Sequence, residues 1–182
     1  MLRKLGLLLI LSLLLACSGE KAKEKVETQE TEDLYWIAVE QQLKELPLNE
    51  AIELGKGEKV LIVFVNPDCP HCRSEWKVLR EHLDKLKIYA FVIPFKSWGE
   101  ENLKKSLYIV CSSNPEKAFD EVLTGKLDGK EINPPRCERI NAHYKAAEVV
   151  GLKAVPLNIL PKQKKVIEGE SPFLLKYLGI EN

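Results

Sequence analysis

The sequence has little that would indicate a metal centre or a nucleic-acid partner. It contains three histidines, of which His82 and His143 lie far apart, and a single Cys-x-x-Cys. A zinc site built on that cysteine pair would need a second pair or closely spaced histidines, so we expect no metal and no other cofactor. The formal net charge is zero. Since a basic patch and an aromatic RNA-binding motif are both missing, we also expect no nucleic-acid binding.

Long hydrophobic runs are missing too. The apolar run at residues 5–15 follows Arg3 and Lys4, and it is shorter than the roughly 20 residues that a membrane-spanning helix needs. A short apolar run after a positive segment is typical of a secretory signal, which we assign to residues 1–16. The run ends in Leu-Leu-Ala followed by Cys17, which resembles the lipobox of bacterial lipoproteins. That resemblance implies a lipid on Cys17; the alternative is ordinary signal cleavage that leaves a free thiol there.

The segment after Cys17 predicts a tether. Residues 18–33 are rich in charge, with one glycine and no aromatic residue, and such a composition buries too little apolar surface to fold. We therefore divide the chain into a signal at 1–16, a flexible tether at 17–33 and a folded domain at 34–182. A lipid on Cys17 would anchor that domain to the extracytoplasmic, or periplasmic, face of a bacterial membrane.

The central motif of the chain joins a strand to a helix through the sequence Cys-Pro-His-Cys at residues 69–72. Residues 60–65 are apolar and mostly β-branched, which is typical of a strand buried on both faces. After the motif, apolar residues recur every three or four positions as far as Leu86, which predicts a helix. Pro70 suits the first helical position, where its missing N–H is not needed.

This placement favours redox chemistry at the cysteines. Free N–H groups and the helix dipole stabilise an anion at a helix N-terminus, and the thiolate is the reactive form of cysteine. We expect Cys69 to be the exposed nucleophile at the helix tip and Cys72 to be the resolving thiol one turn in. His71 adds a positive charge beside the sulfur. Half of a zinc site and a plain structural disulfide are the alternatives.

The remaining segments alternate between strands and helices. Because the second strand follows the motif helix after a short link, we expect it to run parallel to the first. The expected elements are a helix at 34–46, a short turn at 50–54, a strand at 88–93, three helices within 98–151 (the second at 115–123, the third at 139–150), a hairpin of strands at 155–160 and 165–167, and a final helix with Ser171 at its N-cap and Pro172 at its first position.

This order resembles the thioredoxin fold, an α/β fold, with a helical insertion between the second strand and the strand that follows the insertion. Residues 47–178 look like the periplasmic thiol–disulfide interchange family of DsbC and DsbG. Beyond Cys-x-x-Cys, the resemblance rests on Cys111 with the run AFDEV at 118–122, on Cys137 with the run AHY at 142–144, and on the run GLKAVP at 151–156.

The resemblance implies roles for four more residues. Cys111 and Cys137 would form a structural disulfide in the insertion. Pro156 would be a cis-proline that faces the active-site sulfurs, and the backbone of Val155 would bind an extended substrate. The sequence does not identify the buried acid that assists proton transfer in this fold, since Glu53 and Glu58 are near the motif only in sequence.

The chain departs from the family in two ways. Residues 34–57 are too few for the N-terminal dimerisation domain of the isomerases, so we expect a monomer. The Pro-His dipeptide and the valine before Pro156 resemble the oxidase DsbA instead. The sequence thus predicts a lipid-anchored thiol–disulfide oxidoreductase, whether oxidase, reductase or isomerase. It would act on cysteine-containing exported proteins and exchange electrons with a membrane partner similar to DsbB or DsbD. A tethered thioredoxin-fold chaperone or a copper-binding module is the alternative.

Overall fold

The structure is a computed structural model that describes residues 30–180. Residues 30–45 are helical, and they belong mostly to a compact unit separate from residues 45–182. The helix predicted at 34–46 is therefore confirmed, but residues 30–33, which we assigned to the flexible tether, are helical as well. Their charge is no obstacle, because glutamate is a good helix former. The predicted signal at 1–16, the lipidation site Cys17 and the rest of the tether lie outside the described residues.

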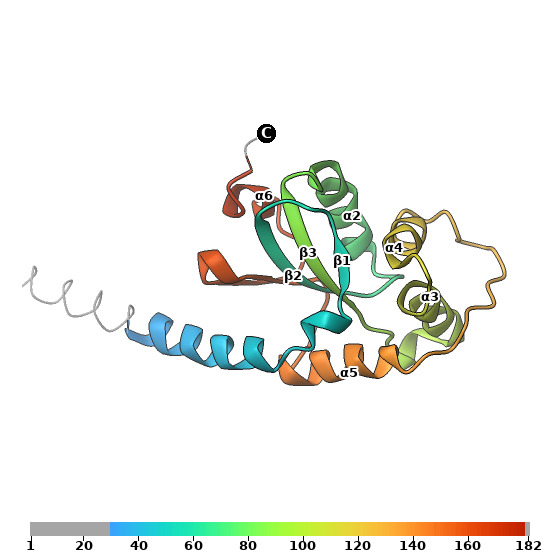
Figure 1. Cartoon of the computed structure of the whole chain (residues 1–182), viewed down its shortest axis with the longest axis horizontal. Helices are drawn as coiled ribbons and strands as arrows, with labels where there is room; N and C mark the ends of the chain where they lie inside the picture. The colour runs from blue at the N-terminus through green and yellow to red at the C-terminus, as the bar shows by residue number, and fades with distance from the viewer. Residues whose placement is uncertain (1–29, 181–182) are drawn as a thin grey trace, which may run out of the picture. The chain divides into compact units, whose positions relative to one another are not determined.

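The second unit contains a five-stranded mixed sheet (Figure 1). Its strands follow the spatial order β1-β3-β2-β4-β5. The neighbours β2 and β3 are parallel, as predicted, whereas β1 pairs with β3, and β4 with both β2 and β5, in antiparallel fashion. The strands are β1 (Ile52–Leu54), β2 (Lys59–Val65), β3 (Leu86–Val92), β4 (Leu157–Leu160) and β5 (Lys165–Glu168).

Five further helices accompany this sheet: α2 (Pro70–Leu79), α3 (Glu100–Val110), α4 (Pro115–Leu123), α5 (Arg139–Val149) and α6 (Leu174–Tyr177). As predicted, α3, α4 and α5 form an insertion between β3 and β4. Helix α4 has the predicted bounds, because Asn114 accepts a hydrogen bond from the N–H of Lys117 at the helix start. A disulfide joins Cys111, at the end of α3, to Cys137, just before α5, with a Cα–Cα distance of 5.6 Å. This is the pairing that the resemblance implied.

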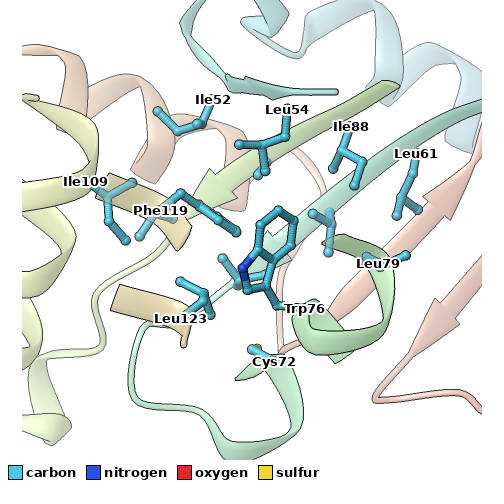
Figure 2. Packing of buried hydrophobic residues seen from close by; sticks show 14 of the residues in the cluster. Ile52, Leu54, Leu61, Cys72, Trp76, Leu79, Ile88, Ile109, Phe119 and Leu123 are labelled. Atoms are coloured by element: carbon cyan, nitrogen blue, oxygen red, sulfur yellow. The ribbon is translucent and has the colours of Figure 1, made fainter. Parts of the chain in front are cut away.

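The core has two halves, because alternate residues of a strand face opposite sides of a sheet. On the α2 side, Cys72 and Trp76 pack among strand residues such as Leu54 and Ile88 (Figure 2), and the Trp76 ring meets Phe119 of α4 edge-on. Helix α5 lies on the opposite face (Figure 1). There Phe64 of β2 stacks on Phe91 of β3, and the Phe91 ring meets His143 edge-on. Strand β2 is therefore buried on both faces, as predicted.

Two predicted elements near the motif were wrong. Residues 52–54 form a strand rather than a turn, because Ile52 and Leu54 are buried, Glu53 is exposed and the three pair with β3. The motif helix ends at Leu79 instead of continuing to residue 86. Leu86 is buried as the first residue of β3, so it belongs to the sheet and not to the apolar face of the helix.

The last predicted helix was also placed too early. Helix α6 begins at Leu174 with Phe173 at its N-cap. The Ser171 hydroxyl accepts a hydrogen bond from the N–H of Phe173, so Ser171 closes a turn before the helix instead of capping it.

Candidate active site

Cys69 occupies the N-cap of α2, and Pro70 is the first helical residue. The Cys69 Sγ accepts a hydrogen bond from the N–H of Cys72 at 3.5 Å. This N–H is one of the free donors at the start of a helix, where the helix dipole also favours negative charge. The motif therefore aims a backbone donor at the sulfur that was predicted to react.

The expectation that Cys69 is exposed was wrong, because only 4% of its surface is accessible and Cys72 is at 1%. The loop before β4 covers the Cys69 sulfur, which lies 3.5 Å from the carbonyl oxygen of Val155. A pocket of about 530 Å³ opens beside Cys69. The other residues that line it are Pro70, His71, Phe95, Ser97, Trp98, Lys153, Ala154 and Val155.

The loop that covers Cys69 contains a cis peptide bond between Val155 and Pro156. The carbonyl oxygen of Pro156 accepts a hydrogen bond of 2.7 Å from the N–H of Gly169, which ties the loop to the end of β5. The fold thus brings Val155 to Cys69 from 86 residues away in sequence, and the peptide bond that follows Val155 is cis, as the resemblance implied.

Cys72 lies in the apolar interior beneath the motif. Burial raises the pKa of its thiol, and Cys69 and Glu75 raise it further, whereas a backbone hydrogen bond with Asn66 acts to lower it. The interior favours the thiol form of Cys72. The two cysteines therefore differ, because the Cys69 sulfur lies at a helix N-terminus and Cys72 is a protonated thiol inside the core.

Glu75 is a buried acid of the site that sequence reasoning missed. It lies three residues after Cys72, on the same side of α2, and it is only 5% exposed. Burial raises the pKa of its carboxyl to about 7, although the Asn158 side chain donates a hydrogen bond to it at 3.0 Å. Both Cys72 and Glu75 line one small void in the core. The sequence signal that could have identified Glu75 is an acidic residue at a position where the periodicity of the helix predicts an apolar one.

The two acids considered from sequence lie elsewhere. Glu53 is exposed on β1 and pairs with Lys87 at 3.3 Å, and Glu58 is exposed just before β2.

His71 is bound by a carboxylate from the far end of the chain. Its imidazole is exposed, and Nδ1 lies 3.0 Å from an oxygen of Glu170. The other Glu170 oxygen accepts a hydrogen bond of 2.6 Å from the Ser74 hydroxyl. Ser74 and then His71 lower the pKa of Glu170. The predicted positive charge next to the sulfur therefore has a negative partner.

A buried amide pair fixes the turn that precedes Cys69. The side chains of Asn66 and Asn102 donate to each other at 2.9 and 2.8 Å, and both residues are fully buried. Asn102 also donates to Asp68 at 2.7 Å. Because Asn102 belongs to α3, the insertion holds the turn in place, which the sequence did not reveal.

Two kinds of feature are missing among residues 30–180. In that part of the chain, no group of three or more His, Cys, Asp or Glu side chains is arranged to hold a metal ion. The helices described there are also too short or too polar to cross a membrane.

Comparison with known proteins agrees with this arrangement. Residues 48–173 match the model of the thioredoxin-like domain family. Over 95 residues the chain is 32% identical to a Bordetella avium protein described as a probable thiol:disulfide interchange protein DsbC, and the match covers 51% of this chain. The chain spans only 32% of that relative's length.

Two solved structures share the fold. The disulfide interchange protein of Neisseria gonorrhoeae has a TM-score of 0.61 at 23% identity, over 72% of this chain and 95% of that one. The thiol-disulfide exchange protein alpha-DsbA2 of Wolbachia pipientis also has a TM-score of 0.61, at 16% identity, over 82% and 96% of the two chains. At these identities the likeness concerns the fold alone.

Proposed function

Because the chain belongs to the thioredoxin-like domain family, we propose that it is a thiol–disulfide oxidoreductase whose Cys69–Cys72 pair exchanges a disulfide with cysteines of exported proteins. One observation supports this proposal most. The Cys69 sulfur accepts the Cys72 N–H at the start of α2 and also lies against the carbonyl oxygen of Val155. A reactive sulfur therefore lies next to a backbone group that a substrate strand can use.

In the oxidising direction, a substrate thiolate attacks the Cys69 sulfur of the Cys69–Cys72 disulfide. The electron pair of the broken bond goes to the Cys72 sulfur, and a mixed disulfide between substrate and Cys69 forms. The substrate's second thiolate then attacks the substrate sulfur of that bond, and Cys69 leaves as a thiolate. The N–H of Cys72 and the helix dipole stabilise this leaving group, which favours the oxidising direction.

Glu75 supplies the proton that Cys72 needs when it leaves. A carboxyl with a pKa of about 7 is present in both protonation states at neutral pH, so it can give a proton in one direction and accept it in the other. The high pKa of Cys72 makes its buried thiolate a strong base that takes this proton.

The substrate binds as an extended segment along the loop before Pro156. Val155 offers its backbone for β-type pairing, and the rings of Phe95 and Trp98, whose centroids lie 5.9 Å apart, form an apolar wall of the pocket at Cys69. The wall suits a hydrophobic side chain near the substrate cysteine.

The setting in the cell is part of the proposal. A signal at 1–16, a lipid on Cys17 and a tether would place a monomeric domain on the extracytoplasmic face of a bacterial membrane. A membrane protein similar to DsbB or DsbD would restore the active pair. That partner sets whether the protein works as an oxidase, a reductase or an isomerase.

The test is a trapping experiment with single-cysteine variants. Cys72→Ser leaves Cys69 free to attack but removes the resolving thiol, so it should accumulate mixed disulfides with a reduced or scrambled client protein. Cys69→Ser should trap none. Non-reducing gels and mass spectrometry read the adducts, and insulin reduction measures turnover of the unmodified protein. Equal trapping by both variants would contradict the assignment. Stoichiometric Cu(I) binding with no insulin reduction would favour the copper-binding alternative.

A further inference from the structure

The three residues that follow β5 contact three parts of the active site. Gly169 donates its N–H to the carbonyl oxygen of Pro156 at 2.7 Å, Glu170 binds two side chains of α2, and the backbone of Ser171 interacts with the Glu75 carboxyl. Gly169 has φ +82°, a conformation that favours glycine, so the chain can turn there towards α2.

Glu170 uses both of its carboxylate oxygens on α2. One accepts the Ser74 hydroxyl at 2.6 Å, and the other lies 3.0 Å from Nδ1 of His71. Because His71 and Ser74 are three residues apart, they lie on the same side of the helix. Ser74 thus fixes the carboxylate in the position from which it binds the imidazole.

This contact bears on the redox pair because His71 lies between the two cysteines. A cationic histidine beside a cysteine stabilises its thiolate, and a carboxylate bound to that histidine offsets the effect. The proposed function uses Cys69 as a thiolate in the reduced form. Reduction of the pair takes up two electrons and one proton, and it yields the Cys69 thiolate and the Cys72 thiol.

We propose that Glu170 is a positioning residue that sets the reduction potential of the Cys69–Cys72 pair through the side chain of His71. Its carboxylate, bound at the imidazole, offsets the stabilisation that a cationic His71 gives the Cys69 thiolate, which makes the pair less oxidising. This inference rests on the proposed function, because it presupposes that the pair cycles between disulfide and dithiol.

The experiment measures the reduction potential in glutathione buffers of graded ratio, with thiol labelling to count the reduced fraction. Glu170→Gln keeps the size of the side chain and its hydrogen-bond acceptor but removes the charge. For an exposed charge pair worth up to about 1 kcal/mol, the equilibrium should move about threefold to fivefold towards the dithiol, which is an increase of roughly 15–20 mV. Ser74→Ala frees the carboxylate without changing any charge, and it should give a smaller shift in the same direction.

Two comparisons separate this role from a general charge effect. In a His71→Ala background, Glu170→Gln should move the equilibrium by less than half as much, since the residue through which it acts is gone. Glu168→Gln is the matched control. This exposed residue on β5 carries the same charge two positions earlier, and its removal should leave the potential unchanged.

An unchanged potential in both Glu170→Gln and Ser74→Ala would overturn the inference. So would a full shift in the His71→Ala background, or an equal shift in Glu168→Gln. Ser74→Ala answers the question if Glu170→Gln does not fold, which thermal melting reports. If the unmodified protein forms no Cys69–Cys72 disulfide in any buffer, the proposed function fails, and this result is distinct from an unresponsive Glu170.

Discussion

Replacing Glu75 with glutamine should change how stability depends on pH. In the folded protein, burial raises the pKa of Glu75 from 4.5 to about 7. Between these values the native state binds more protons at this site than the unfolded chain does, so stability falls as pH rises. At about 1.4 kcal/mol per pKa unit, the shift from 4.5 to about 7 corresponds to roughly 3 kcal/mol, which is lost progressively as pH rises from 4.5 to about 7.

A second buried group acts in the opposite direction. Burial lowers the pKa of His143 to about 4, and Arg139 contributes in the same sense. The unfolded chain then binds more protons at this residue between pH 4 and 6.5, so His143 makes stability rise with pH over that window. The pH dependences of stability that come from Glu75 and from His143 therefore oppose each other, and measurements on the unmodified protein alone would not separate them.

The difference between the unmodified protein and Glu75→Gln isolates the carboxyl, because His143 is present in both. We expect the variant to gain stability relative to the unmodified protein as pH rises from 5 to 8, by up to about 3 kcal/mol. Urea unfolding of the reduced proteins at several pH values measures this difference. Parallel pH curves for the two proteins, or a variant that loses relative stability as pH rises, would refute the assignment of Glu75 as a buried acid of raised pKa.

Three further predictions concern residues around the site. Replacing both Cys111 and Cys137 with alanine opens a loop with a sequence separation of 26 and should lower the free energy of unfolding by about 3 kcal/mol. The folded variant should still reduce insulin; loss of insulin reduction without destabilisation would mean that this pair carries electrons. Asn102→Ala removes the two buried hydrogen bonds between Asn102 and Asn66, which should destabilise the protein by about 2 kcal/mol. It should also speed alkylation of the neighbouring active-site thiol by iodoacetamide, whereas unchanged labelling would mean that α3 does not hold the active-site turn in place. Trp98→Ala should raise the KM for a peptide with a hydrophobic residue near its cysteine several-fold and leave kcat nearly unchanged; an unaltered KM would place the substrate elsewhere.

The parts of the fold that the sequence predicted are those that local rules determine. The apolar run of β2 and the capped start of α4 carry their signals within a few residues, and the thioredoxin-like α/β fold follows from the order of such elements. Strand β1 has only three residues and depends on pairing with β3, more than 30 positions away. No local pattern distinguishes such a short edge strand from a turn.

The active site likewise combines features that a local sequence signal predicts with features that depend on long-range contacts. Cys-x-x-Cys at a helix start is a local signal, and it placed Cys69 at the N-cap. Cys69 is covered by Val155, and Glu75 is in contact with Asn158. In each of these two pairs the residues are more than 80 positions apart in the sequence. The periodicity of the helix does not reveal which distant residues make these contacts.

The shielding of Cys69 has a consequence for when a client protein could react with it in the proposed exchange. Because only 4% of the Cys69 residue is accessible and Val155 lies against its sulfur, we expect a cysteine on a strand flexible enough to lie along Val155 to react faster than one held on a rigid surface. We expect newly exported chains to react readily and their mature forms to react slowly. The proposed exchange would then distinguish client proteins by how far they have folded.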